Sequence, residues 1–395
     1  MTTNTTSGRA ERLRQLVCVR SYADSNGIGL ESVPMDEVGT GPGAVDVVGR
    51  VEAALDEVPS WVDDPQEYRR ALKVLLRETE KTALRMDAGA ETPDDDADAV
   101  VLEAVVRADG TRPSLFVQDD QVDDKLPLVG QWAADLVASR KPLRHVIKAV
   151  GRIQPDNATG RNFFGTGWVV DTDKGLVLTN LHVLEAMWKR LGHLMRQTRT
   201  GFEVLGGAYI DFAAESGRDR TNRCRIVAAT PSGVDGKDFA RLDAAVLRIE
   251  PENGGKVPAA IPVSGNPDGP QGSLASHCVV GYPGPPPYTS GTTNGVDWAW
   301  VNATLFGNRY GVKRLAPGNT HRPLGSFAPK DPEKWVFGHD CTTLGGNSGS
   351  PLLAWKESTP AAFGLHFAGA TADTNCAHAI SACAKQLRAL GVPVQ

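Results

Sequence analysis

A histidine, an aspartate and a serine, each beside a short apolar run, are the side chains of this sequence with the clearest chemical potential. His182 lies in a TNLHV segment, Asp243 in an LDAAVL segment and Ser348 in a GGNSGSP segment. A serine hydroxyl is a weak nucleophile at neutral pH, so it needs a base to accept its proton, and the base needs a carboxylate that fixes its tautomer. The three residues together predict acyl transfer, with His182 as base, Asp243 as orienting carboxylate and Ser348 as nucleophile.

Each of these residues also has a simpler interpretation when it is taken alone. A histidine at a strand end is often a buried structural residue, and an aspartate on an alternating strand is often a surface carboxylate. Asp238 and Asp211 are the alternative carboxylates, although neither begins so clear an apolar run. A Gly-x-Ser-x-Gly elbow is absent because position 350 is serine, and the order His, Asp, Ser differs from those of α/β-hydrolases and subtilisins.

Five motifs in a fixed order carry a resemblance to a known family. They are GTG at 165–167, the TNLHV, LDAAVL and GGNSGSP segments, and GLHFAG at 364–369. In these motifs the sequence resembles the chymotrypsin-fold serine peptidases, and within them the bacterial trypsin-like branch that includes HtrA and the glutamyl endopeptidases. The resemblance covers roughly residues 145 to 395. It implies a serine endopeptidase that uses His182, Asp243 and Ser348 in the roles given above.

The glycines before the serine predict a site for the oxyanion of a tetrahedral intermediate. Gly346 permits an unusual backbone turn that can align its own N–H with that of Ser348, and two such donors stabilise the developing charge by several kcal/mol. In the family, the residue before the serine is often an aspartate that pairs with a new N-terminus after zymogen cleavage. Here it is Asn347, as in the bacterial branch, so activation by that ion pair is not expected.

The substrate pocket is predicted from the same resemblance. Position 342 holds threonine where trypsin-like enzymes carry the aspartate that attracts Lys or Arg, so Thr342 argues against basic P1 residues. Thr343 and His366 match positions that bind an acidic side chain in glutamyl endopeptidases, and a hydroxyl with an imidazole can donate hydrogen bonds to a carboxylate. The alternative is a small or apolar pocket that His366 merely lines. Glutamyl endopeptidases also use a free mature N-terminus at the pocket, whereas about 140 residues precede this domain.

Short apolar runs rich in Val, Ile and Gly follow one another through the last 250 residues and predict a mainly β fold. With the resemblance, they predict a chymotrypsin-like double β-barrel with a small N-terminal helical domain. A helix is expected at 129–139 and another at 381–390. The expected strands are 146–153, 167–170, 176–178, 204–212, 224–228, 242–249, 278–282, 301–306, 351–354 and 363–367.

A chain of 395 residues exceeds the roughly 100 to 200 residues of one domain, and three parts are predicted. Residues 1–86 show helical periodicity and form a small helical module. Residues 87–128 form an acidic linker, with twelve Asp or Glu against two Arg between 87 and 124. Residues 129–395 form the trypsin-like protease domain. The helical module loosely resembles adaptor domains that recruit bacterial proteases; a stabilising cap and an autoinhibitory pro-region are the alternatives.

The composition limits the classes of binding partner and the cellular compartment that the sequence predicts. The net charge of −5 gives no indication of nucleic-acid binding, and no apolar run reaches the roughly 18 residues of a membrane span. No signal peptide is visible, so a cytoplasmic protein is expected. The six cysteines contain no CxxC pair, which predicts scattered free thiols. They are Cys18, Cys224, Cys278, Cys341, Cys376 and Cys383.

No metal and no cofactor are expected. HExxH is absent, and five further histidines lack ligand-like spacing, namely His193, His277, His321, His339 and His378. The expected partners are a protein or peptide substrate and a protein that binds the helical module. The alternative function is a catalytically silent, protease-like binding module that keeps the grooves without the chemistry.

Overall fold

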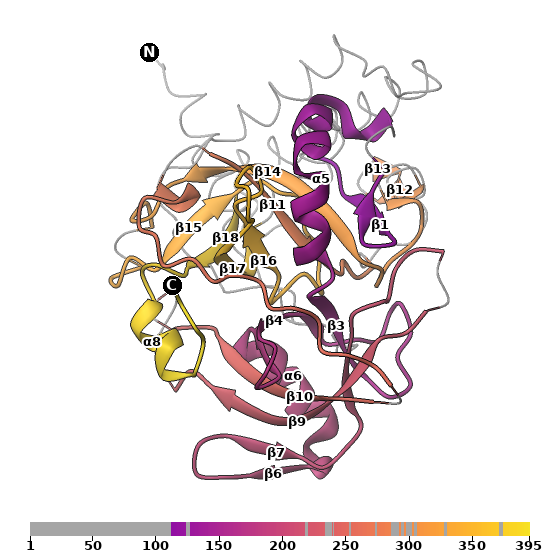
Figure 1. Ribbon diagram of the computed structural model, residues 1–395, viewed down its shortest axis with the longest axis vertical. Helices are drawn as coiled ribbons and strands as arrows, with labels where there is room; N and C mark the ends of the chain where they lie inside the picture. Colours follow the sequence, from indigo (N-terminus) through magenta and orange to yellow (C-terminus); the bar gives the residue numbers. More distant parts are fainter. Residues whose placement is uncertain are drawn as a thin grey trace, which may run out of the picture.

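The computed structural model describes residues 112–395, apart from short gaps. These gaps are 124–126, 218–219, 234–238, 240, 253, 273–274, 286–291, 294–295, 298–301, 304–305, 328–329 and 371–373. The predicted helical module at 1–86 lies outside the described residues. The described part is mainly β and consists of two closed six-stranded barrels, which confirms the predicted double-barrel fold (Figure 1).

The first barrel, in the lower half of Figure 1, closes through the pairing of β9 with β10. The order around it is β10-β5-β4-β3-β8-β9, and the hairpin β6–β7 extends from β9. Its strands are β3 (Val150–Pro155), β4 (Gly165–Asp171), β5 (Leu176–Thr179), β8 (Ala208–Asp211), β9 (Arg223–Pro231) and β10 (Ala245–Pro251), with β6 (Met195–Gln197) and β7 (Phe202–Val204) in the hairpin.

The second barrel lies above the first in Figure 1 and closes through β11 and β14. The order is β11-β16-β17-β18-β15-β14, and β1 with β2 extends the sheet from β14. Its strands are β11 (Ser276–Gly281), β14 (Arg314–Arg322), β15 (Val336–His339), β16 (Pro351–Leu353), β17 (Ala362–Ala370) and β18 (Thr374–Ala379). A separate two-stranded pair consists of β12 (Thr292–Thr293) and β13 (Val296–Asp297).

Helices are few among the described residues. They are the 3₁₀ segments η1 (Pro127–Trp132), η2 (Gly192–Leu194) and η4 (Pro270–Gly272), and the α-helices α5 (Ala133–Ile147), α6 (Leu181–Leu191) and α8 (Ala384–Ala389). The helix expected at 129–139 instead runs on to Ile147 with Pro142 inside it. The strand expected from 146 therefore starts only at Val150. Burial of Leu143, Val146 and Ile147 outweighs the loss of one N–H at the proline.

Other boundaries also differ from the expectations. A strand was expected at 301–306, but the described residues of this segment, 302, 303 and 306, are helical, and the Gly307 N–H donates to Ala303 O at 3.0 Å. The run at 204–212 is split into β7 and β8 by a turn in which Gly207 adopts a φ of +75°. Strand β14 was not expected because its sequence, RLAPGNTHR, carries charges and turn residues. Its Arg314 is buried, with the guanidinium 3.8 Å from the ring centre of Phe116.

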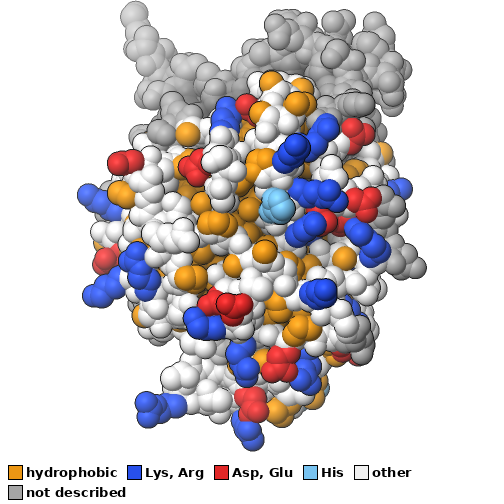
Figure 2. All heavy atoms as spheres, in the orientation of Figure 1, with side chains coloured by type: hydrophobic (Ala, Val, Ile, Leu, Met, Phe, Trp, Pro, Cys, Tyr) orange, Lys and Arg blue, Asp and Glu red, His pale blue; other side chains and the backbone are white. Residues whose placement is uncertain are grey.

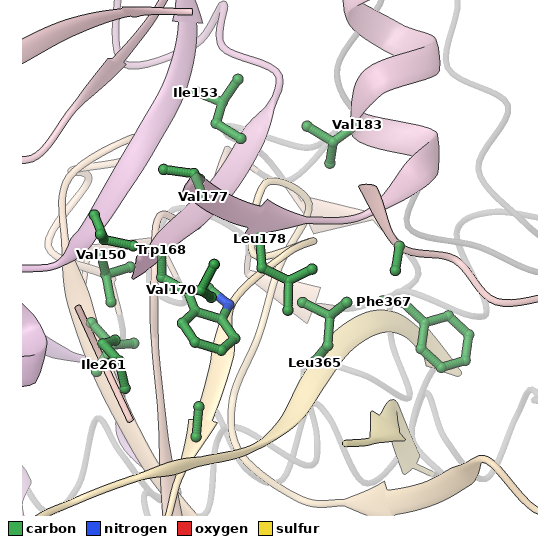
Figure 3. Packing of buried hydrophobic residues seen from close by; sticks show 14 of the residues in the cluster. Val150, Ile153, Trp168, Val170, Val177, Leu178, Val183, Ile261, Leu365 and Phe367 are labelled. Atoms are coloured by element: carbon green, nitrogen blue, oxygen red, sulfur yellow. The ribbon is translucent and has the colours of Figure 1, made fainter. Parts of the chain in front are cut away.

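One apolar core crosses from the first barrel to the second. Trp168 on β4 is completely buried at its centre, and Val183 of α6 lies in the same cluster (Figure 3). Leu365 and Phe367 on β17 belong to that cluster too, so side chains of the second barrel pack against the first. This shared core holds the facing ends of the two barrels together, because burial of apolar surface is the main stabilising term.

The predicted acidic linker extends too far toward the C-terminus. Residues 115–118 form β1, which pairs with β14, and residues 121–122 form β2 (Leu115–Gln118 and Gln121–Val122). The acidic composition of this region gave no indication of a strand. The fully buried side chains of β1 are Leu115 and Val117, and two such positions are too few to reveal the alternating pattern of a strand. On the face drawn in Figure 2, acidic and basic side chains lie intermingled.

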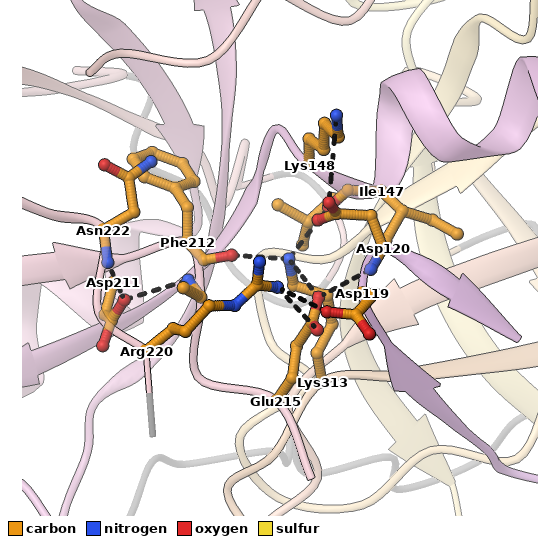
Figure 4. Close-up of polar contacts among 12 residues, drawn as sticks. Asp119, Asp120, Ile147, Lys148, Asp211, Phe212, Glu215, Arg220, Asn222 and Lys313 are labelled. Atoms are coloured by element: carbon orange, nitrogen blue, oxygen red, sulfur yellow. Dashed lines mark hydrogen bonds and ion pairs between the residues drawn. The ribbon is translucent and has the colours of Figure 1, made fainter. Parts of the chain in front are cut away.

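A buried charge cluster fastens the β1–β2 turn to the junction of the barrels (Figure 4). The Lys313 Nζ, without exposed surface, donates to Ile147 O at 3.0 Å and Phe212 O at 2.7 Å, and lies 3.9 Å from Glu215. Burial lowers the pKa of Lys313 to about 8. The Asp120 N–H donates to Glu215 Oε1 at 3.1 Å. The end of the predicted linker is thus part of the protease domain.

Candidate active site

His182 and Asp243 meet at one end of the first barrel. The chain leaves β5 through Asn180 and enters α6, which places His182 in the first turn of the helix. Asp243 lies just before β10, the strand that pairs with β5. The His182 N–H donates to Asp243 Oδ1 at 2.9 Å, and the ring Nδ1 lies 2.5 Å from Asp243 Oδ2. The carboxylate therefore fixes both the backbone and the imidazole of His182.

Asp243 stays ionised although only 14% of its side chain is exposed. Burial alone raises the pKa of its carboxyl, but the charge and hydrogen bonds of His182 outweigh burial, so the pKa lies below its ordinary value. Its backbone is held as well, because Asn180 Nδ2 donates to Asp243 O at 2.8 Å and the Asp243 N–H donates to His378 Nε2 at 3.1 Å. Neither Asn180 nor His378 was predicted to have a role at the site.

Ser348 lies in the loop between β15 and β16 of the second barrel. The glycine on each side of the Asn347–Ser348 pair has a positive φ, +94° for Gly346 and +88° for Gly349, which residues with a Cβ rarely adopt. A Cβ at Gly349 would lie 2.1 Å from Thr166 O. The expected unusual backbone turn at Gly346 is therefore present.

Thr166 of β4 anchors this loop to the first barrel. The Thr166 N–H donates to Ser348 O at 2.9 Å, and its Oγ1 donates to Gly346 O at 2.8 Å. Gly165 lies beside it, and a Cβ there would meet Ser348 O at 3.0 Å and Val183 Cγ2 at 2.7 Å. The residue after His182 and the peptide of Ser348 thus border the same point of β4. Thr166 was noted in the sequence only as part of the GTG motif, and the hydrogen bond from its hydroxyl to Gly346 O was not predicted.

The hydroxyl of Ser348 is buried and makes no hydrogen bond with the described residues. Ser348 has no exposed surface and His182 is 8% exposed, so a peptide reaches the hydroxyl only after neighbouring groups move aside. Hydrogen bonds between catalytic groups are often long or absent without substrate and tighten when it binds.

Asp211 and Asp238 are the two alternative carboxylates that the sequence offered. Asp211 ends β8, and its Oδ1 accepts the N–H groups of Ala213 at 2.9 Å and Asn222 at 3.1 Å. These bonds stabilise a turn, and Asp211 is not the partner of His182. Asp238 lies outside the described residues.

The three predicted pocket residues are all buried. Thr342 Oγ1 donates to Arg112 O, and Thr343 Oγ1 donates to Asn375 Oδ1 at 2.9 Å. His366 lies on β17, with its Nδ1 3.1 Å from His339 Nε2. Burial lowers the pKa of His339 well below its ordinary value, so this ring is neutral.

Three other features of the described residues bear on function. No group of three or more His, Cys, Asp or Glu side chains there is arranged to hold a metal ion. In the same part of the chain, no helix has the length and apolar character to cross a membrane. The five cysteines that the structure describes are free and buried; Cys18 lies outside them.

Two comparisons with known proteins identify the family of this chain. The trypsin-like peptidase domain family matches residues 165–358. A probable serine protease of Lysobacter enzymogenes is 38% identical over 387 residues, which cover 96% of this chain and 98% of the relative. The chain belongs to the trypsin-like serine peptidases. It is a serine endopeptidase, a hydrolase of the chymotrypsin fold.

This serine endopeptidase is also similar to a solved structure, that of Rv3671c from M. tuberculosis H37Rv, crystallised as a mutant in an inactive form. The identity is 17% and the TM-score is 0.34, with 64% of this chain and 91% of that chain covered. The Lysobacter relative aligns along almost the whole peptidase, so their similarity includes most of the residues before 112.

Proposed function

We propose that this serine endopeptidase hydrolyses peptide bonds with a triad of His182, Asp243 and Ser348. The observation that carries the proposal is the double contact of Asp243 with His182, through the backbone N–H and through Nδ1. A neutral imidazole whose Nδ1–H is bound by a carboxylate has its unprotonated Nε2 available as a base. Thr166 and Gly165 bring the Ser348 peptide beside the helix turn that carries His182.

The reaction follows from these roles. His182 accepts the hydroxyl proton as Ser348 Oγ attacks the substrate carbonyl carbon, and the carbonyl oxygen becomes an oxyanion. The protonated imidazole then gives its proton to the leaving amine, and an acyl-enzyme remains. Water, deprotonated by His182, attacks the ester, and the acid product leaves with Ser348 restored. Asp243 stays ionised throughout and stabilises the imidazolium that forms in each half of the reaction.

Two peptide orientations support an oxyanion site at the N–H groups of Gly346 and Ser348. In a trans peptide the C=O and the following N–H point in opposite directions. Gly345 O accepts the N–H of Gly284 at 2.5 Å, and Asn347 O accepts the N–H of Ser350 at 2.9 Å. Each carbonyl is thus fastened within the protein, and the N–H on the opposite side of each peptide is directed away from that contact.

A fluorophosphonate probe tests the triad, because labelling requires an activated serine. Wild type should be labelled and should cleave a protein substrate, whereas Ser348→Ala should do neither while keeping its circular dichroism spectrum. His182→Ala should be nearly as inactive, since the residues act as a unit. Turnover by Ser348→Ala at the wild-type rate would exclude the assignment. A folded wild type that neither reacts nor cleaves would favour the silent binding module.

We propose further that the pocket takes acidic P1 residues and that His366 is the group on which binding of their carboxylate depends most. The hydroxyls of Thr342 and Thr343 both donate to oxygens of the protein itself. The neutral His339 ring contacts Nδ1 of His366 and fixes the orientation of that imidazole, whose N–H can donate a hydrogen bond to a substrate carboxylate.

Mass spectrometry of a digested peptide library measures this preference. Cleavage should fall after Glu and Asp, and His366→Ala should lose most activity on acidic peptides and little on others. Thr342→Ala, whose hydroxyl faces Arg112, is the matched control and should keep the preference. Cleavage mainly after Arg or Lys would contradict the proposal, and cleavage after Leu or Phe would indicate an apolar pocket.

For the residues before 112 we propose a regulatory or recruiting module in a cytoplasmic enzyme. The similarity to the Lysobacter relative includes most of this region, which supports a part shared by both proteins rather than an accidental extension. Fractionation of the producing cells tests the compartment, and recovery of the enzyme outside the cytoplasm would contradict the cytoplasmic proposal.

Deletion of residues 1–111 tests the module. A partner protein that binds the full-length chain but not the shortened chain would support recruitment. Faster substrate cleavage by the shortened chain would instead indicate inhibition.

A further inference from the structure

A buried histidine of the second barrel contacts the aspartate of the first. His378 lies on β18 without exposed surface, and its Nε2 accepts the N–H of Asp243 at 3.1 Å. The imidazole stacks on Phe367, with ring centres 4.2 Å apart and planes 14° from parallel. Stacking and burial leave the ring one orientation, so the acceptor is fixed in space.

This contact differs in origin from the other bonds that hold Asp243. Its carbonyl is bound by Asn180, and its carboxylate is bound twice by His182, so those three bonds all come from the junction of β5 and α6. They fix Asp243 within the first barrel. The bond to His378 joins Asp243 to the second barrel, which carries Ser348.

A short path of strand contacts continues from His378 to the serine loop. On β17, Leu365 is the register partner of His378. The next residue, His366, holds the loop on both sides: its N–H donates to Ser350 O at 3.0 Å, and its carbonyl accepts the N–H of Gly349 at 2.9 Å. Two neighbouring residues of β17 thus connect the support of Asp243 with the peptides that follow Ser348.

We propose that His378 is a positioning residue that holds the His182–Asp243 pair in register with Ser348 across the two barrels. The inference rests on the proposed role of Asp243. Proton transfer from Ser348 to His182 depends on their separation, and a misplacement of about 1 Å costs on the order of 10²-fold in rate. Without the bond from His378, the His182–Asp243 contact stays intact, but the Asp243 backbone loses its hydrogen bond to the serine-bearing barrel.

The protonation state of His378 suits this role. A backbone N–H can only donate, so Nε2 is the unprotonated nitrogen and Nδ1 carries the proton. Burial lowers the pKa of His378 to about 4, although the charge of Asp243 acts in the opposite direction, so the ring remains an acceptor at neutral pH. Its Nδ1 has no hydrogen-bond partner among the described residues. Keeping a buried donor unsatisfied costs stability, which an apolar side chain would avoid.

Paired substitutions test the proposal in the full-length protein. His378→Leu removes the acceptor, and His378→Gln keeps an oxygen near the place of Nε2. We expect His378→Leu to lower kcat by about 10- to 100-fold with KM changed less than about twofold, and His378→Gln to recover most of the loss. The pH dependence of kcat/KM should keep its midpoint, because the Asp243–His182 contact is untouched. Should the leucine variant not fold, His378→Asn, whose amide is too short to reach, takes its place.

The matched control is His277→Leu, which alters another fully buried histidine of the same barrel that lies on β11. It should lower the melting temperature without lowering kcat. Equal loss in His378→Leu and His378→Gln, a loss that appears in KM, or an unchanged kcat in His378→Leu would overturn the proposal. Asp243→Asn distinguishes failure of the proposed triad from failure of the proposed role of His378. A wild-type kcat in Asp243→Asn would reject the triad. An inactive Asp243→Asn together with a fully active His378→Leu would reject only the positioning role of His378.

Discussion

At the scale of single residues, the carboxylate next to the proposed base His182 decides which of its ring nitrogens carries a proton. The Asp243 oxygens bind the His182 N–H and Nδ1, whereas Asp211 Oδ1 accepts the backbone N–H groups of Ala213 and Asn222. An amide in place of the Asp243 carboxylate can present an NH₂ group to Nδ1, which favours the tautomer that has its proton on Nε2. That tautomer cannot accept the serine proton.

Asp243→Asn should therefore lower kcat by about 10⁴-fold at neutral pH and leave the fold unchanged. Steady-state cleavage of a peptide substrate, with circular dichroism beside it, measures both effects. Asp211→Asn is the matched control: it weakens two bonds to the N–H groups of Ala213 and Asn222, so the melting temperature should fall while kcat stays within about twofold. A greater loss of kcat in Asp211→Asn would reverse the choice of carboxylate.

At the scale of elements, β4 brings together the helix of the proposed base and the loop of the proposed nucleophile. Gly165 separates Val183 of α6 from the Ser348 carbonyl, and neither neighbour leaves room for a methyl group. The Val183 side chain can rotate, but the Ser348 oxygen is held by Thr166 N–H at 2.9 Å and cannot withdraw without breaking that bond. The space at Gly165 thus sets how closely α6 and the serine loop approach.

Gly165→Ala should push the loop and the helix apart and lower kcat about 10- to 100-fold, with a smaller change in KM. Peptide cleavage kinetics and the rate of fluorophosphonate labelling measure this, and both should fall together. Gly233→Ala provides a comparison: it also replaces a glycine, which is exposed two residues after β9 with nothing within 4 Å of its Cβ position. It should cost stability at its φ of +66° without slowing cleavage. Wild-type kinetics in Gly165→Ala would show that the spacing is not critical.

The elements also show what the sequence could and could not predict. Motifs predicted His182, Asp243 and Ser348, and short Val-rich runs predicted most strands, because both signals are local. Helix α6 was not predicted, since TNLHV follows a strand without a break in apolar character. Strand β18, TNCAHA, was not predicted either, because its polar His378 and Asn375 form their hydrogen bonds with Asp243 and Cys341, which lie far away in the chain. Tertiary partners, which no local pattern contains, decided these elements.

At the scale of the whole molecule, the second barrel buries several uncharged imidazoles. His277, His339 and His378 have no exposed surface, and burial lowers the pKa of all three, to about 3 for His277 and about 4 for His378. In the unfolded chain a histidine titrates near pKa ~6.5. Between these values the unfolded state binds protons that the folded state does not, so acid shifts the equilibrium toward unfolding. The same burial raises the pKa of Glu215 and Asp331, which acts in the opposite direction.

The free energy of unfolding should therefore fall as the pH drops from 7 toward 4, by up to about 1.4 kcal/mol per pH unit for each of the three histidines. Urea unfolding at pH 7 and pH 5 measures the difference. His277→Gln removes one titrating group, so the variant should lose stability at pH 7 but show a shallower decline by about one proton. Val279→Ala, which shortens a buried apolar side chain of the same strand β11, is the control: it should lose stability at both pH values and leave the slope unchanged. Equal stability of the wild type at pH 5 and pH 7 would mean that these imidazoles accept protons inside the folded barrel, and the closed packing of its core would then have to be reconsidered.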